Sequence, residues 1–137
     1  TFTVYAMKDA DGANLDRIQI IKGWVDSEAR THEEIINVTW SGDRKLSADG
    51  KLQAVGNTVD LKTAKYTNSI GAASLMGSWT DNKFDPDQHA FYYARVLEIP
   101  TPRWSTYDAV KNDLPLLEEV AATIQERAWS SPVWYKP

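Results

Sequence analysis

The sequence has no cysteine, only two histidines and no long apolar run. Without cysteine there can be no disulfide, no thiol nucleophile and no cysteine-ligated zinc site. The apolar runs fall far short of the roughly 20 residues that a membrane-spanning helix needs. We therefore expect no membrane insertion, and a fold that depends on its hydrophobic core alone.

An excess of basic charge is also missing. The 15 basic and 19 acidic residues give a net charge of -4, so we expect no nucleic-acid partner. The 137 residues are 42% hydrophobic and 25% charged, which is typical of one globular domain. A chain of this length can bury about two-thirds of its unfolded surface. We predict a single domain over residues 1–137, and we interpret it as a C-terminal fragment of a longer protein.

Segments of alternating apolar and polar residues recur between turn signals along most of the chain. Residues 36–40 alternate most regularly, and residues 90–99 are apolar on both faces, as in a central strand. The pattern predicts strands near residues 2–8, 16–25, 36–40, 73–79, 90–99 and 128–135. The fold class we expect is mainly β, an immunoglobulin-like antiparallel β-sandwich of about seven strands.

A long insertion, at about residues 100–127, separates the last two predicted strands. It should be partly helical, with Ser105 or Thr106 capping a turn that runs to Val110 and a second turn over residues 116–120. Pro132 places the last strand at an edge or a bulge. Insertions of this length usually have a function or cover another surface.

Residues 90–94 (AFYYA) suggest the immunoglobulin assignment. Tyr92 would be the corner tyrosine whose hydroxyl bonds a nearby backbone group, and Ala94 would stand where such domains carry their second cysteine. Trp40 would then be the buried core tryptophan. The alternative is an ordinary aromatic strand.

Catalytic motifs are missing from the chain. His32 and His89 have no metal-ligand spacing, the glycines are isolated, and no GxSxG motif occurs. We predict no catalytic residue and no cofactor in this chain, which leaves an autonomous enzyme as the least favoured interpretation.

Two acidic loops carry oxygen ligands at short spacing, but neither matches an EF-hand. Asp81, Asp85 and Asp87 are weak calcium candidates. The other loop contains Asp9, Asp11, Asn14 and Asp16. The alternative for both loops is ordinary turn chemistry through Asx side chains.

Six tryptophans and six tyrosines are the unusual feature of the composition. Trp24, Trp40 and Trp79 sit at alternating strand positions and are predicted in the core. A second set of aromatic and arginine residues lies in or beside the insertion and the last strand, and we predict that it contacts a partner or a ligand. These candidates are Arg103, Trp104, Tyr107, Arg127, Trp129 and Trp134.

The two arginines suit an anionic group, because a guanidinium offers a planar fork to phosphate, sulfate or carboxylate. The alternative is pairing within the chain. The acidic candidates for such pairs are Glu98, Asp108 and Glu126.

Four stretches make the chain similar to a known family: residues 16–24 (DRIQIIKGW), 55–60 (VGNTVD), 91–104 (FYYARVLEIPTPRW) and 123–132 (TIQERAWSSP). They resemble the C-terminal part of a large bacterial family, domain of unknown function 3604, over essentially the whole chain. Its members are several times longer, are often exported, and resemble metal-dependent hydrolases of the polymerase-and-histidinol-phosphatase (PHP) superfamily.

The resemblance implies that a metal site with a divalent metal lies upstream, in a catalytic domain of the same polypeptide. This chain would then be a noncatalytic accessory domain that docks on that domain, in the periplasm or outside the cell. The alternative is a carbohydrate-binding module that uses exposed tryptophans. Substrate, metal identity and oligomeric state stay open.

Overall fold

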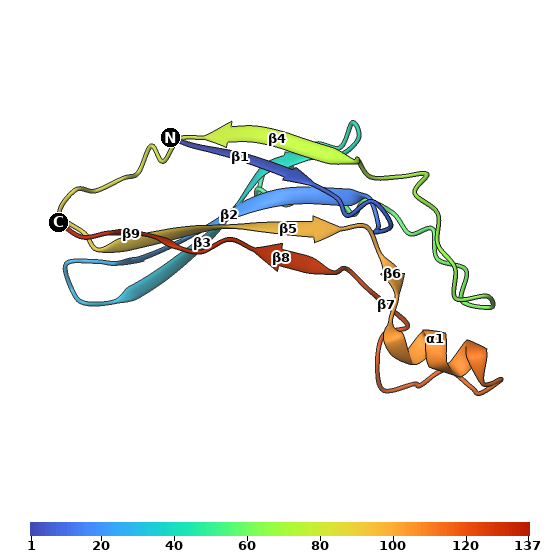
Figure 1. Ribbon diagram of the computed structural model, residues 1–137. Coiled ribbons are helices and arrows are strands. Elements are labelled where there is room, and N and C mark those ends of the chain that lie inside the picture. The colour runs from blue at the N-terminus through green and yellow to red at the C-terminus, as the bar shows by residue number, and fades with distance from the viewer.

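A computed structural model describes residues 1–137 and shows two main antiparallel sheets that face each other, with a third, two-stranded sheet in the insertion (Figure 1). The smaller sheet pairs β1 (Phe2–Met7) with β4 (Ser74–Trp79). The larger sheet contains five strands: β3 (Thr31–Trp40), β2 (Leu15–Val25), β5 (Ala90–Glu98), β8 (Arg127–Trp129) and β9 (Val133–Tyr135). The mainly β, sandwich-like architecture is therefore confirmed.

The order of the larger sheet is β3-β2-β5, and β8 and β9 both pair with the far edge of β5. β2 is paired on both sides and most of its residues are buried, including the polar Asp16, Gln19 and Lys22, which all have partners inside the structure. β1 and β2 follow each other in the chain but belong to different sheets, so their connection is a crossover and not a hairpin.

The core fills the space between the sheets. One cluster contains Leu15, Ile18 and Leu75, and a second contains Ile20, Ala90 and Tyr92. Trp24 and Trp79 are partly buried against the second cluster, as predicted. The core therefore depends on both sheets and on residues from most of the chain.

Trp40 was predicted in the core, and this prediction is wrong. It ends the edge strand β3 and is only half-buried, and its Nε1 donates a hydrogen bond to the backbone oxygen of Arg44. The corner tyrosine also differs from the prediction. The Tyr92 hydroxyl donates to the Asp81 carboxylate at 2.8 Å and not to a backbone group.

The insertion extends beyond one end of the larger sheet (Figure 1). It contains β6 (Thr101–Pro102), α1 (Trp104–Lys111) and β7 (Thr123–Ile124), and β6 pairs with β7. Arg103, not Ser105 or Thr106, is the N-cap residue. The helix predicted over residues 116–120 does not form, because most of this segment is exposed and has no core to pack against.

The last strand is interrupted where the sequence predicted an edge or a bulge. Pro132 lies between β8 and β9 and has no backbone N–H to donate. The Ser130 hydroxyl there accepts a hydrogen bond from the Ala94 backbone N–H at 3.0 Å. No helix of the structure is long and apolar enough to cross a membrane.

Candidate functional site

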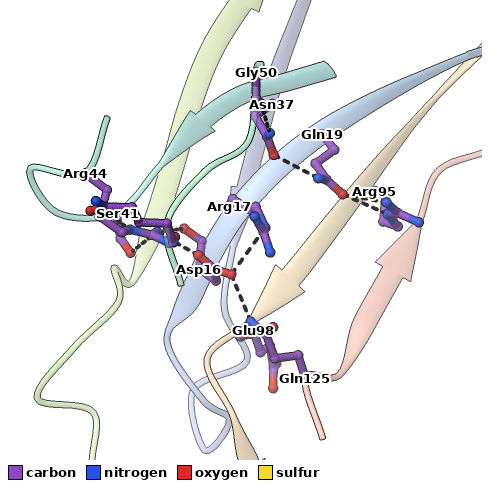
Figure 2. A network of polar contacts seen from close by, with 11 residues as sticks. Asp16, Arg17, Gln19, Asn37, Ser41, Arg44, Gly50, Arg95, Glu98 and Gln125 are labelled. Carbon is purple, nitrogen blue, oxygen red and sulfur yellow. Dashed lines mark hydrogen bonds and ion pairs between the residues drawn. The ribbon is translucent and has the colours of Figure 1, made fainter. Parts of the chain in front are cut away.

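Asp16, at the start of β2, is a buried carboxylate that joins segments far apart in the sequence (Figure 2). Only 1% of it is exposed. Its Oδ1 lies 2.6 Å from Arg44 Nη2, in the loop after β3. Its Oδ2 accepts a hydrogen bond of 2.8 Å from Gln125 Nε2, in the insertion, and lies 3.3 Å from Arg17 Nε. Because a buried charge is costly unless it is paired, these contacts hold the loop and the insertion against β2.

A second buried carboxylate, Asp81, lies just after β4. Its Oδ2 is 2.6 Å from Nζ of Lys22, a residue that is only 5% exposed. Burial alone would raise the pKa of Asp81, but hydrogen bonds from Lys22 and Tyr92 hold that pKa below its ordinary value. Burial, together with the Asp81 carboxylate, raises the pKa of the Tyr92 hydroxyl. Lys22 and Asp81 therefore form an ion pair, and the Tyr92 hydroxyl is hydrogen-bonded to the Asp81 carboxylate of that pair.

The acidic calcium candidates are not brought together. Asp81 is held by Lys22 and Tyr92, and the Asp85 carboxylate accepts a hydrogen bond from the Asp87 backbone N–H. Nowhere do three histidine, cysteine, aspartate or glutamate side chains gather in a metal-binding arrangement. Asx-turn contacts of the kind named as the alternative are present in this loop, and Asp9 makes the same contact in the other loop.

The six contact candidates fall in two places. Arg103, Trp104 and Tyr107 lie at the start of α1, at one end of the molecule. Arg127 and Trp129 belong to β8 and Trp134 belongs to β9, on the larger sheet. The structure therefore separates one predicted surface into a helical end and a sheet face.

At the helical end, Trp104 is 71% exposed and Tyr107 is 43% exposed. Arg103 is anchored by its own Nε, which donates to the Ala121 backbone oxygen at 2.9 Å. Neither Arg103 nor Arg127 makes an ion pair, so the predicted alternative of pairing with Glu98, Asp108 or Glu126 is not observed.

The outer face of the larger sheet, turned away from β1 and β4, carries the second group. One row of directly opposite residues runs across four strands: Glu33, Gly23, Phe91 and Trp134. The Phe91 ring leans over Gly23 so closely that a Cβ added there would lie 2.4 Å from the tip of the ring. The ring centroids of Phe91 and Trp134 are 5.1 Å apart. The Tyr93 ring lies 7° from parallel to Phe91.

A hollow of about 480 Å³ opens at this row. Its rim is formed by four polar side chains that make no hydrogen bond or ion pair within the chain. They are Thr31, Glu33, His89 and Lys136. A second hollow of about 300 Å³ continues along the same face and shares Phe91 and Trp134 with the first. Trp129 lines only the second hollow.

Sequence reasoning found Trp134 and Trp129 but missed Gly23, Phe91 and Glu33. Gly23 carried the available signal, because a glycine inside a strand often marks the close approach of a ring, a backbone or a ligand. Phe91 was counted only as part of an aromatic strand, and its place beside Gly23 depends on strand register, which the sequence did not specify.

A comparison with protein-family models matches residues 1–137 to the family described as "Protein of unknown function (DUF3604)". The chain belongs to the DUF3604 family. The match covers all of the described residues, as the resemblance of the four sequence stretches led us to expect. Comparisons of this DUF3604 chain with curated proteins and with solved structures gave no significant match.

The two long sides of the DUF3604 sandwich differ, because the two sheets are in contact along one side and leave a strand edge uncovered along the other. On one side β4 packs against β3, where Gly77 approaches Thr39 and Val38. On the other side β1 pairs only with β4, so its outer edge has no strand partner. Three hollows follow one another along that edge, of about 330, 270 and 330 Å³, between β1 and the β8–β9 edge. We call this side the open seam, and it is lined by β1 residues 2–7 and by 127–135.

Proposed function

We propose that this DUF3604 chain is a noncatalytic accessory β-sandwich that docks on the catalytic domain of a longer polypeptide, a PHP-like metal-dependent hydrolase of bacterial origin. The open seam is the single observation that carries the proposal. An unpaired strand edge presents a row of backbone donors and acceptors, which proteins normally cover or pair.

The lining of the seam favours an extended segment as the occupant. Half of the backbone groups of β1 point away from β4, and the hollows beside them reach Ile20, Tyr92 and Val96 of the core. A strand added to β1 would supply the missing hydrogen bonds, and its inward side chains would fill the hollows. We assign this strand to the same polypeptide, outside the 137 residues.

Catalysis belongs elsewhere in this proposal, which is supported by the structural pairing of the best-buried carboxylates and of one of the two histidines. Asp16 and Asp81 are bound to basic residues, and His32 lies 2.7 Å from the Asp26 carboxylate. We assign a divalent metal to the catalytic domain, which is supported by the lack of any group of three histidine, cysteine, aspartate or glutamate side chains that could hold one here. We propose a location in the periplasm or outside the cell, which the family resemblance supports and which fractionation would test.

Hydrogen exchange on the isolated chain and on the full-length parent tests the docking directly. Backbone amides of β1 that face the seam should exchange rapidly in the isolated chain and become protected in the parent. Equal exchange rates for β1 in both proteins would contradict the proposal.

A pair of matched variants adds an independent measurement. Val133→Asp places a charge in the seam at a position that is 58% exposed, and it should weaken association between the separately expressed domains at least tenfold. Val25→Asp introduces the same change on the outer face of the larger sheet, where the residue is 37% exposed, and should leave association unchanged.

The helical end supplies a second contact in this proposal, with Arg103 and Tyr107 facing the rim of the catalytic domain's active site. Trp104→Ala should reduce domain association, whereas a role at the active site predicts that Arg103→Ala lowers turnover with stability intact.

A further inference from the structure

The outer face of the larger sheet combines features that the docking proposal does not use. The row Glu33, Gly23, Phe91 and Trp134 crosses four strands, and its glycine leaves a gap that side chains otherwise fill. The Phe91 ring lies over that gap and forms the base of the hollow, and the neighbouring Trp134 has 66% of its surface exposed. We infer that this hollow is a binding site for a glycan chain.

The chemistry of the lining matches that of a sugar. A pyranose has a face of C–H bonds and a periphery of hydroxyl groups, so it needs an apolar ring below it and hydrogen-bonding groups around it. Phe91 and Trp134 provide the apolar surface. Glu33 and Thr31 on one side and His89 and Lys136 on the other provide acceptors and donors that no group of the protein occupies.

The dimensions fit more than one sugar. The hollow of about 480 Å³ lies within the usual range for ligand sites, about 300–1,000 Å³. The second hollow, of about 300 Å³, continues from the shared rings Phe91 and Trp134 toward Trp129. Two adjoining hollows with rings between them suit an oligosaccharide that runs along the sheet face.

A proline-rich peptide is the other ligand that aromatic grooves commonly take. The rim argues against it, because the Glu33 carboxylate is an acceptor that needs donors, and a proline residue has no backbone N–H. Sugar hydroxyls donate readily. The observations therefore favour the glycan, and the peptide becomes an outcome of the test.

Calorimetric titration of the 137-residue chain with a panel of hexasaccharides tests the inference. The panel contains cellohexaose, xylohexaose, mannohexaose, chitohexaose and an alginate hexasaccharide, and decaproline serves as the peptide probe. We expect at least one hexasaccharide to bind and to change the tryptophan fluorescence. Failure of the whole panel to bind, or binding of decaproline alone, would overturn the inference.

Substitutions test whether the glycan binds at the proposed residues. Trp134→Ala should raise the Kd of that hexasaccharide at least tenfold, and Glu33→Gln should raise it about threefold by weakening one acceptor. Trp104→Ala removes an equally exposed tryptophan at the other end of the molecule and should leave the Kd within twofold. A Kd that Trp134→Ala and Glu33→Gln both leave unchanged would refute the site.

Trp129→Ala distinguishes the two hollows, since it should weaken the hexasaccharide and leave the matching disaccharide unaffected. Trp134 also lines one hollow of the open seam, whereas Glu33 lies outside the seam, so Glu33→Gln tests the glycan site separately from the docking surface. If no sugar binds but domain association is intact, only the glycan site is refuted. If a sugar binds but the domains do not associate, only the docking proposal is refuted.

Discussion

Asp16 and Asp81 are both carboxylates that are removed from water and paired with basic groups, but they lie in different parts of the molecule. Asp16 lies at the start of β2 and pairs with groups from an outlying loop and from the insertion. Asp81 lies between the sheets and pairs with a lysine and a tyrosine of the sandwich itself. The comparison indicates that Asp16 fastens the peripheral segments to the sheet, whereas Asp81 fastens one sheet to the other.

The largest effect is expected from Asp16→Asn, which weakens two arginine contacts and leaves charges buried. Breaking such a network typically costs about 3–5 kcal/mol of unfolding free energy. Urea denaturation measures this loss. Hydrogen exchange should show that protection falls first in residues 41–53 and in the insertion. Asp11→Asn changes an exposed carboxylate and should stay within about 0.5 kcal/mol of the parent.

Lys22→Met should cost less, about 2–3 kcal/mol, because Asp81 keeps the hydroxyl of Tyr92 and the backbone N–H of Lys83. The double variant Lys22→Met, Asp81→Leu should recover much of this loss, since replacing a buried pair by apolar residues is often neutral. Urea denaturation midpoints of the parent, the two single variants and the double variant give the coupling free energy between Lys22 and Asp81. A double variant less stable than either single one would contradict the assignment of Asp81 as an internal pair.

Tyr92→Phe removes only the hydroxyl that donates to Asp81 and should cost about 1.5–2 kcal/mol, at the lower end of the range for a hydrogen bond to a charged group because Lys22 still pairs with Asp81. The ring remains packed on Phe2, whose centroid lies 4.7 Å away. Thermal unfolding would check this. Tyr93→Phe, on the outer face, makes no hydroxyl contact and is the matched control.

The smallest effect is the acid dependence of the Asp81 pair. The pKa of Asp81 is lower in the folded state than the ordinary unfolded value of about 3.9. Its stabilising contribution is therefore complete above that value and is lost as the pH falls toward the folded pKa. Urea midpoints between pH 6 and pH 3 should fall more steeply for the parent chain than for Asp81→Asn. Parallel pH profiles would show that Asp81 is not the group responsible.

Sequence reasoning predicted what depends on local pattern. Alternation located most long strands to within a few residues, although β3 begins five residues before its predicted start, and Pro132 marked the edge break. Trp40 was misplaced because alternation shows which face a residue takes but not whether the strand lies at an edge.

Partners that are distant in the sequence could not be predicted. Asp16 appeared to belong to a turn, because Gln125 approaches it across 109 positions of sequence. The pairing of Lys22 with Asp81 was not predicted for the same reason, since Asp81 lies in the loop after β4, 59 positions away in the sequence. Gly23 and Phe91 became a site only through strand register. Contacts of this kind arise from tertiary packing, which no single segment encodes.

The interruption of the last strand at Pro132 also concerns solubility. An edge that is broken, twisted and deprived of an N–H is a poor template for a further strand, so the β8–β9 side resists sheet extension between molecules. β1 has no such break and carries the exposed side chains of Tyr5 and Met7. Chains produced without their covering partner should therefore self-associate through β1, and aggregation, where it occurs, should begin at that strand.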